Sequence, residues 1–551
     1  MTTRADRHDD RPRVTLALAT LIAAASAAVV VWRVAHIAVL LDLSYVLNNA
    51  QRIASGDVPY RDFALPYPPL TFVVQAVLIR IAGAHYLVAS AYAVALDALA
   101  VALAVFIVYR IVGRPMVAAS ICAPLAVLGV HDIFPHPFYD ADASALMLAA
   151  IAATLWALDA RTRVPWLVAG ASLPLPLLAK QNLGVAFLAL MVTALAVTLL
   201  RERRRAELGV ALVGVALTVA ASAVVLQLTA GLARVVASTV VLASARLAAS
   251  APPLAWLADL GAAAAVALTL AGFVAYRRSV GAWRASALVA VVTPYAFVAG
   301  LELAAPRSDA ILTLWPLGML LGCAAGALAA LRGRATFVSF LPFVCAGVAT
   351  AAFLSQGVAG SSYALWPLLA VAFAVAVREA RDVSLGASPL RSIAIPAAGL
   401  LVLVAGAAYV RADTRLSFLR LDGAVQTSAF PALAGLSAPG TFVGELDAAL
   451  AYLAARVPAD DELIAFPGED PVHFALGRRT RFPVLQFDPT TDPYTPTELR
   501  ALRDATGVRW IFVKRELQAP AIPNLASNEA ALTEGFDLVG TAGAYAVYRR
   551  P

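Results

Sequence analysis

Charge is what this sequence has least of. Only 14% of its 551 residues are charged, whereas soluble domains carry about 25%. Hydrophobic residues make up 61% of the chain, and apolar runs long enough to cross a membrane recur along most of it. These features exclude a soluble protein and predict a polytopic helical membrane protein. The net charge of +7 is modest and comes from arginines between the hydrophobic runs, which indicates topology and not nucleic-acid binding.

Cysteine is scarce as well. Cys122, Cys323 and Cys345 all lie in apolar segments, and the polar C-terminal region has none. This excludes a disulfide framework and a zinc motif. The small residues of AAASAA in the first apolar run are compatible with a cleaved signal peptide. The run continues beyond them as VVVW, which favours an uncleaved membrane anchor.

The arginine clusters predict the topology, because cytoplasmic loops collect Lys and Arg. With residues 1–13 in the cytoplasm, we expect a transmembrane domain over 14–410 to cross the membrane thirteen times. An outer domain joined to thirteen spans favours the bacterial inner membrane. This places an outer loop at 35–85, a second outer loop at 131–141, and the C-terminus outside. The predicted spans lie near 14–34, 86–109, 116–130, 142–159, 165–179, 183–200, 208–228, 255–275, 286–304, 310–330, 336–354, 362–377 and 392–410.

Two outer segments depart from a simple span. The run 70–83 is too short to cross and carries Arg80, so we expect it to lie at the outer interface. The segment 229–253 carries Arg234 and Arg246 on the side that should lack arginines, and is interpreted as an amphipathic or re-entrant piece.

The tail from 411 to 551 is predicted to be a small extracytoplasmic α/β domain. The stretch TPTELRALRDATG has Thr495 and Glu498 as a capping box and Gly507 as its stop, which predicts a helix over 495–507. Helices and strands alternate around it, which favours an α/β arrangement. We expect a further helix at 446–458 and strands at 462–468, 509–516 and 544–550.

The first outer loop begins with an acid. Asp42 stands beside two leucines, and partial desolvation would raise its proton affinity and suit a general base. Alternatively, Asp42 is the N-cap of a helix that ends at Gly56, because Asp is a favoured N-cap. Tyr60, Asp62 and Tyr67 follow, with several prolines, and would form the walls of a substrate cavity.

The second outer loop, HDIFPHPFYDADA, is another polar cluster. Asp140 and Asp142 stand at the mouth of a span, and His136 precedes them. Either acid is a candidate for catalysis, with helix capping as the alternative. Carboxylate ligands suit a divalent cation such as Mg²⁺ or Mn²⁺, although the spacing matches no specific metal motif, so the sequence leaves a divalent cation open as a cofactor.

Lysine is nearly absent. The chain has Lys180 and Lys514 against forty arginines, and Lys180 lies between two apolar runs in LPLLAKQNLG, at the predicted outer surface. It either extends its ammonium to lipid phosphates or holds one specific phosphate. A weaker polar cluster contains Glu302, Arg307 and Asp309.

Together these stretches resemble the C-type glycosyltransferases, in particular the protein mannosyltransferase and aminoarabinose transferase branch. The similar motifs cover about residues 14–205, and the rest is similar in architecture only. The motifs are LLDLSYVLNNAQRIASGDVPYRDF, YPPL at 67–70, FYDADASALMLAA, LAKQNLG and a tail that ends in a YRR strand.

The resemblance implies transfer of a sugar from a polyprenyl-phosphate donor to a lipid, glycan or protein acceptor at the outer face of the membrane. It assigns Asp42 to catalysis with Asp140 or Asp142. Unlike some relatives, the chain has Leu43 and not a second acid after Asp42, and Tyr67 replaces a basic residue before the paired prolines. The donor phosphate would therefore be bound by Lys180, Arg61 or Arg307. The substrate cavity would be lined by Tyr60, Asp62, Tyr67 and His136.

Two other functions remain open. A flippase or transporter of lipid-linked glycans would place ionisable groups at mid-membrane, but most acids gather on one face, with Asp97 as the main exception. A non-catalytic scaffold would not require paired acids beside an isolated lysine. Apart from the substrates, the expected partners are membrane lipids.

Overall fold

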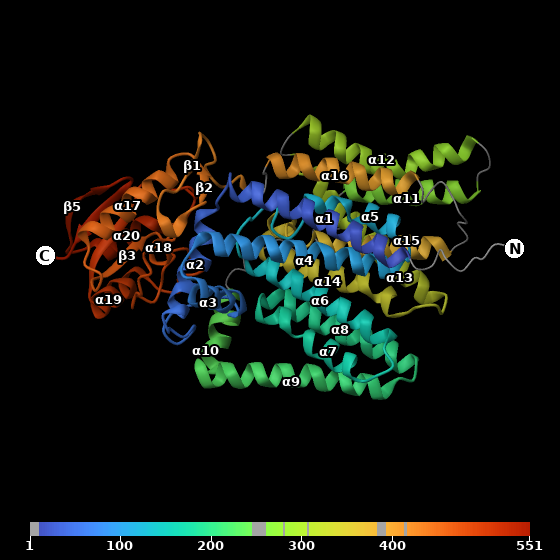
Figure 1. Cartoon of the computed structure of the whole chain (residues 1–551), viewed down its shortest axis with the longest axis horizontal. Coiled ribbons are helices and arrows are strands. Elements are labelled where there is room, and N and C mark those ends of the chain that lie inside the picture. The colour runs from blue at the N-terminus through green and yellow to red at the C-terminus, as the bar shows by residue number, and fades with distance from the viewer. Residues whose placement is uncertain (1–9, 245–259, 279–281, 306–307, 383–392, 413–415) are drawn as a thin grey trace.

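Long apolar helices running roughly alongside one another form one part of the molecule, and a mixed α/β tail packs against one end of them (Figure 1). The structure is a computed structural model that describes residues 10–244, 260–278, 282–305, 308–382, 393–412 and 416–551.

By length and composition, eight helices in the described ranges could cross a membrane. They are α1 (Asp10–Val34), α4 (Tyr86–Val112), α6 (Tyr139–Asp159), α8 (Gln181–Arg201), α9 (Arg205–Thr229), α13 (Leu314–Leu331), α14 (Phe337–Ser361) and α16 (Ile395–Ala412).

The other five expected spans coincide with shorter or less uniformly apolar helices. These are α5 (Pro115–Cys122), α7 (Val164–Ser172), α11 (Leu260–Arg278), α12 (Ala282–Ala304) and α15 (Trp366–Asp382). Both α5 and α7 pass into short 3₁₀ turns, at Ala123–Ala126 and Leu175–Leu178, that contain proline. Proline cannot donate the backbone hydrogen bond that would continue the helix. The polytopic helical fold is thus confirmed, and the described ranges contain eight of the thirteen expected spans as helices long and apolar enough to cross.

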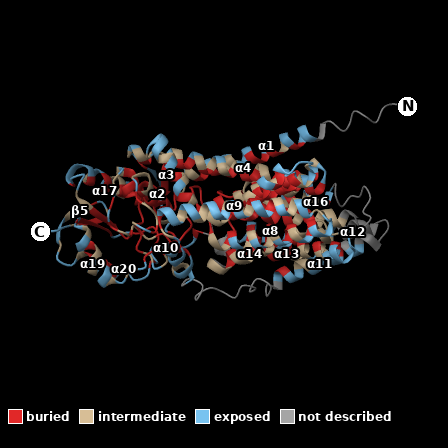
Figure 2. Ribbon diagram, turned by 90° about the horizontal axis from the view of Figure 1, so that it is seen from below, coloured by how far each residue is buried: buried red, intermediate tan, exposed pale blue. Residues whose placement is uncertain are grey.

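Close approach between helices depends on glycine. A Cβ atom on Gly170 of α7 would overlap the backbone of Ala211 in α9, and one on Gly399 of α16 would overlap the backbone of Ser120 in α5. Small residues at such contacts are typical of membrane helices. On its outer side α9 exposes Leu217, Val224 and Leu228 (Figure 2), as expected of a surface in contact with lipid.

The first loop lies between the bundle and the tail. It contains α2 (Leu40–Ala54) and α3 (Leu70–Ala82), with α10 (Leu232–Val236) nearby (Figure 1). The run 70–83 is thus a short helix, as expected. The segment 229–253 is helical through α10 and a π-helical turn at Ala237–Leu242, whereas its residues 245–253, with Arg246, lie outside the described residues.

The tail contains a four-stranded sheet in the order β3-β4-β6-β5. Its first two strands are parallel and the others antiparallel. The strands are β3 (Glu462–Phe466), β4 (Val508–Lys514), β5 (Asp537–Ala542) and β6 (Tyr545–Arg549), and a separate hairpin pairs β1 (Val425–Thr427) with β2 (Ser437–Pro439). The helices are α17 (Phe442–Arg456), α18 (Val472–Leu476), α19 (Pro496–Thr506) and α20 (Leu525–Thr533). The predicted α/β tail is confirmed, and α19 begins with the expected capping box.

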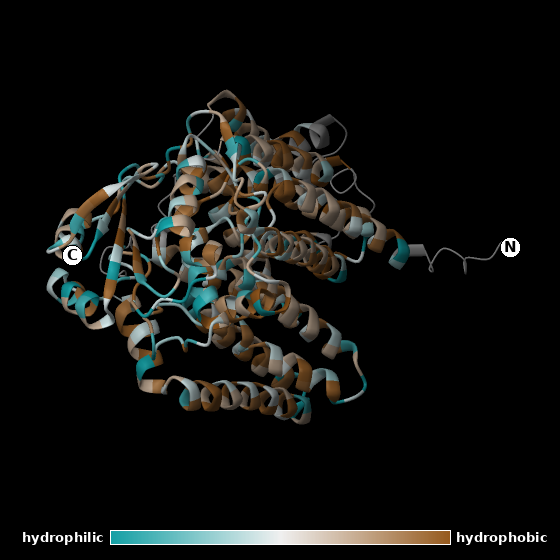
Figure 3. Ribbon diagram, turned by 60° about the vertical axis from the view of Figure 1, so that its left-hand side comes forward, coloured by the Kyte–Doolittle hydropathy of each residue, from teal (hydrophilic) through white to brown (hydrophobic). Residues whose placement is uncertain are grey.

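The tail and the first loop share one hydrophobic core. Leu43 and Leu47 of α2 pack in the same buried cluster as Leu446 of α17 and Phe474 of α18. Hydrophilic residues gather around this junction, whereas the bundle helices are mostly hydrophobic (Figure 3). The α2 helix is therefore an integral part of the tail's packing.

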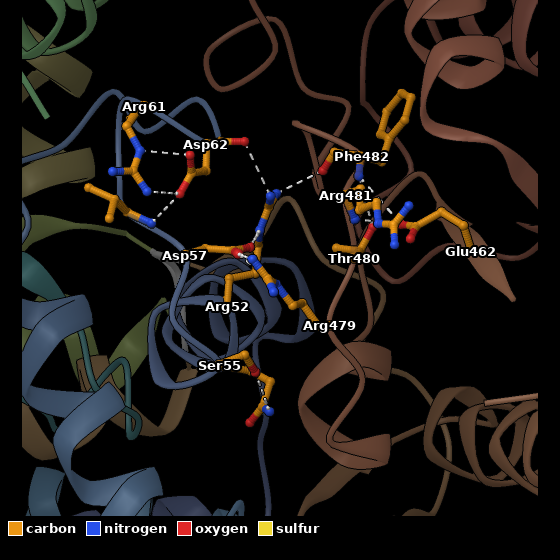
Figure 4. Close-up of polar contacts among 12 residues, drawn as sticks. Arg52, Ser55, Asp57, Arg61, Asp62, Glu462, Arg479, Thr480, Arg481 and Phe482 are labelled. Carbon is orange, nitrogen blue, oxygen red and sulfur yellow. Dashed lines mark hydrogen bonds and ion pairs between the residues drawn. The ribbon is translucent and has the colours of Figure 1, made fainter. Parts of the chain in front are cut away.

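An ion network also joins the two parts. The Asp57 carboxylate lies 2.9 Å from Arg52 Nε and 2.6 Å from an Arg479 guanidinium nitrogen. Arg52 also donates to the Phe482 carbonyl at 2.7 Å (Figure 4). Arg52 and Asp57 are buried, so two arginines, one from each part, neutralise a carboxylate that would otherwise be costly to bury.

Candidate active site

A buried ion pair lies where the second loop meets α8. Lys180 Nζ is 3.2 Å from Asp140 Oδ2, and these side chains are only 8% and 10% exposed. The Tyr363 hydroxyl donates to the same carboxylate oxygen at 3.2 Å. Lys180 has extended backbone just before α8 because the proline-containing turn at Leu175–Leu178 ends the preceding helix. Asp140 lies in the first turn of α6.

Two tyrosine rings complete the surroundings of Lys180. Its ammonium lies 4.2 Å from the Tyr139 ring centroid and 4.9 Å from that of Tyr67. The two rings stack at 4.1 Å. Cation–π contacts of this kind favour a positive charge, more strongly when water is excluded. The ammonium is thus held by protein groups, and the geometry does not require the lipid-phosphate interpretation of Lys180.

Asp142 points away from this pair. It accepts hydrogen bonds from the Thr71 hydroxyl of α3 and, at 2.8 Å, from the Tyr92 hydroxyl of α4. Residues two apart on a helix lie on nearly opposite sides. Of the two candidate acids in this loop, only Asp140 contacts Lys180 in the described structure, and Asp142 ties α6 to α3 and α4.

Asp42 lies in the first turn of α2 and is half-buried. The helix begins at Leu40 with Val39 as its N-cap, so the N-cap alternative for Asp42 is wrong. One turn further, Tyr45 packs edge-on against Tyr67 at 5.8 Å. Residues three apart share a helix face, so Asp42 lies on the face of α2 that is directed toward the Tyr67–Lys180 group.

Tyr60 supports Tyr67. Its hydroxyl donates to the Tyr67 carbonyl at 2.7 Å, and its own backbone has φ of 68°, a conformation that non-glycine residues rarely adopt. Asp62 accepts from the Val58 backbone at 2.8 Å and pairs with Arg61 at 2.9 Å. The Arg61 hydrogen bonds hold the pKa of Asp62 below its usual value. In the described structure, this exposed pair makes no bond to Asp140 or Lys180.

The remaining predicted residues have different surroundings. His136 is fully buried and packs edge-on against Phe134 and Phe138. Burial lowers the pKa of His136 to about 3, so its ring is neutral. Arg307 lies outside the described residues. Glu302 accepts a hydrogen bond from the Ile311 backbone at 2.8 Å.

Asp97 has a structural explanation. The Ser26 hydroxyl of α1 and, at 3.0 Å, the His131 backbone N–H donate to its carboxylate. Asp97 therefore joins α1, α4 and the start of the second loop, which accounts for an acid inside a span without a transported ion.

The expected divalent cation has no ready set of ligands. In the ranges that the structure covers, no three His, Cys, Asp or Glu side chains come together in a way that could hold a metal. Asp140 is paired with Lys180, and Asp142 with two hydroxyl groups. We therefore derive no step through a metal.

Tyr363 and Tyr139 are the site residues that the sequence did not reveal. Tyr363 is 223 positions from Asp140 in the chain, and neither tyrosine belongs to a charged or repeated motif. The signal available for Tyr139 was its place in FYDADA, directly before the acid.

No family model and no curated protein matches the sequence, but solved structures match the fold. The Archaeoglobus fulgidus oligosaccharyltransferase in complex with Zn and sulfate is 16% identical, with 97% of this chain and 73% of that chain aligned and a TM-score of 0.52. The same enzyme tethered to an acceptor peptide with the NVT sequon is 14% identical over 98% and 74%, with a TM-score of 0.51. ArnT from Cupriavidus metallidurans bound to undecaprenyl phosphate is 13% identical over 96% and 97%, with a TM-score of 0.46. The chain thus has the fold of the Archaeoglobus fulgidus oligosaccharyltransferase, in agreement with the polytopic helical fold with an α/β tail that the resemblance implied.

Proposed function

We propose that this protein is a membrane glycosyltransferase that moves a sugar from a polyprenyl-phosphate donor to a lipid, glycan or protein acceptor. The observation that supports this function is the buried Lys180–Asp140–Tyr363 group, walled by Tyr67 and Tyr139. It lies on the fold of the C-type glycosyltransferases, at the end of the bundle where the first loop and the tail meet the helices.

In the proposed reaction, the acceptor hydroxyl attacks the anomeric carbon of the sugar. Asp42 takes the hydroxyl proton, the bond from the anomeric carbon to the phosphate oxygen breaks, and the polyprenyl phosphate leaves with the electron pair. A single displacement inverts the anomeric carbon. Lys180 stabilises the charge that develops on the departing phosphate, and Asp140 with Tyr363 holds the ammonium in place before the donor binds.

An apolar cavity of about 370 Å³ suits the prenyl chain. It lies among α5, α11, α12, α13, α15 and α16, and its lining includes Leu314, Leu369, Val402 and Trp366. Trp366 is three residues from Tyr363, which contacts Asp140. A chain in this cavity would therefore approach the ion pair from within the bundle.

We also propose that the membrane is the bacterial inner membrane, with residues 1–13 in the cytoplasm and residues 411–551 outside. The arginine-rich segments between spans support this orientation. An alkaline phosphatase fusion after Pro551 is expected to be active. An inactive fusion would contradict the proposed orientation.

Sugar transfer tests the proposed activity. Membranes that contain the wild-type protein are supplied with a panel of radiolabelled polyprenyl-phosphate sugars, and label in endogenous lipid, glycan and protein is measured. At equal expression, Asp42→Asn is expected to lose about 10²–10⁴-fold, the contribution of a general base. Lys180→Met should lose about 100-fold or more.

The control is Arg61→Gln, which removes an exposed cation of the first outer loop and should retain transfer. No transfer by the wild type from any donor would contradict the proposed function. Full activity of Asp42→Asn would remove Asp42 from the mechanism, and loss in Arg61→Gln equal to that in Lys180→Met would contradict the assignment of the phosphate to Lys180.

A further inference from the structure

The first turn of α2 is capped by the tail. Its N-cap residue, Val39, has no side-chain acceptor for the first backbone N–H groups of the helix. The Leu40 N–H donates instead to Gln518 Oε1 at 2.9 Å, and Gln518 Nε2 donates to the Ala38 carbonyl at 2.9 Å. Gln518 is fully buried. One amide side chain, 478 positions away in the chain, thus bonds to the first backbone N–H of the helix and to the carbonyl two residues before it.

Gln518 is itself held by a buried ion pair. Its backbone N–H donates to Glu469 Oε1 at 2.8 Å, and the Ala519 N–H donates to the other carboxylate oxygen at 3.0 Å. Lys514 Nζ lies 2.7 Å from the same Glu469 carboxylate. Because these groups are buried and mutually bonded, the amide of Gln518 has little freedom to move.

The residues that hold Gln518 lie at one edge of the tail's four-stranded sheet. Glu469 follows β3 and Lys514 ends β4, so both lie at the carboxyl ends of the two parallel strands, where open α/β sheets bind their ligands. Here α2 occupies that edge: Ser44 donates to the Gly468 carbonyl at 2.6 Å, and Asn48 donates to the Asp470 carbonyl at 3.1 Å. The tail therefore uses its ligand edge to hold a helix of the same chain.

We propose that the tail clamps the active-site loop, and that Gln518 is a positioning residue for Asp42. Asp42 lies two residues after Leu40, in the turn that Gln518 caps. Without a cap, the first turn of a helix frays, and the carboxylate would lose its fixed direction. The positioning role rests on the proposed function of Asp42, whereas the clamp does not.

The test compares Gln518→Met with Gln426→Met in the full-length protein in detergent. Methionine keeps the volume but removes the amide. Gln426 is the control for loss of a tail glutamine amide: it is exposed and accepts a backbone hydrogen bond from Gly444 at 3.2 Å, far along the chain from α2. Hydrogen–deuterium exchange is measured over residues 38–47, and kcat and KM for the donor are measured separately.

We expect Gln518→Met to exchange faster at the start of α2 and to lose about tenfold or more in kcat, since small misplacements of a reacting group are costly. KM for the donor should stay unchanged, and Gln426→Met should behave as the wild type. Adding Val39→Thr to Gln518→Met supplies an N-cap hydroxyl that accepts from the second or third backbone N–H of the helix, and should restore part of the protection and of kcat.

The outcomes separate the two proposals. Unchanged exchange in Gln518→Met would overturn the clamp. Faster exchange with unchanged kcat, or a KM effect alone, would overturn the positioning role. Absence of transfer by the wild type would count against the proposed function only, because the exchange measurement would still decide the clamp.

Discussion

Asp140 and Asp142 show how two neighbouring acids acquire different surroundings from helix geometry alone. Asp140 contacts Lys180 and Tyr363, and Asp142 contacts Thr71 and Tyr92. The sequence indicated that both acids mattered but not which one contacts the lysine. That choice depends on the rotation of α6 about its axis and on partners far along the chain.

This difference gives a prediction for the second loop. Thr71 and Tyr92 donate to different carboxylate oxygens of Asp142. Asp142→Asn keeps one oxygen that accepts from one hydroxyl, and its NH2 group can donate to the oxygen of the other, so it should lose less than the roughly 100-fold typical of a missing general acid or base. Asp140→Asn removes the charge that faces Lys180 and should lose about 100-fold or more. Transfer assays at equal expression decide it, and equal losses in the two variants would contradict the assignment.

His473 gives the pH prediction. Its ring is buried, and burial lowers its pKa to about 3, whereas an unfolded histidine titrates near 6.5. Below about pH 6.5 the unfolded chain binds a proton that the folded protein does not, so stability falls as pH falls, by at most about 1.4 kcal/mol per pH unit. His473→Phe should remove this contribution.

Thermal unfolding at pH 8 and pH 5 checks it. The Tm of His473→Phe relative to the wild type should be higher at pH 5 than at pH 8. His85→Phe, at an exposed position, is the control and should leave the difference between the two pH values as in the wild type. The same pH sensitivity in His473→Phe as in the wild type would refute the explanation.

At the scale of elements, hydropathy and capping signals were sufficient for most helices. The capping box and Gly507 predicted α19, and all thirteen expected spans coincide with helices. The strand β5 was missed because most of its residues are exposed and show no alternation of polar and apolar side chains. The breaks after α5 and α7 occur at turns that contain proline. Whether a proline interrupts a membrane span depends on the neighbouring helices, so the sequence alone did not predict these breaks.

Helix contacts supply a prediction at this scale. Gly170→Ala places a Cβ against the Ala211 backbone and should separate α7 from α9, which costs about 1–3 kcal/mol. Gly209→Ala, in α9, meets no atom within 4 Å and should leave stability unchanged or raise it by up to about 1 kcal/mol. Thermal unfolding in detergent compares the two, and an equal loss in both variants would contradict the packing explanation.

At the scale of the whole molecule, the tail and the bundle are joined through α2. The sequence predicted two parts, but not that a helix of the first loop packs in the core of the second. Leu43 and Leu47 read as ordinary apolar residues of the first outer loop, and only the tertiary structure places them beside Leu446 and Phe474.

This shared core predicts coupled stability. Leu47→Ala should destabilise the tail by about 2–5 kcal/mol, because it leaves a cavity in a buried cluster. Leu217→Ala, on the exposed side of α9, is the matched control and should have little effect. Limited proteolysis of the tail in detergent, followed by mass spectrometry, measures the difference. Equal cleavage rates in Leu47→Ala and Leu217→Ala would show that the tail folds independently of α2.

The bond between Gln518 and Leu40 also sets an order of events during synthesis. The ribosome makes Gln518, which lies 478 residues after Leu40, after the long apolar helices of the described structure, so the start of α2 lacks its cap until those helices have been synthesised. The loop that carries Asp42 can reach its final form only after Gln518 has been translated. A chain that terminates before Gln518 would therefore contain the bundle helices with the first turn of α2 uncapped.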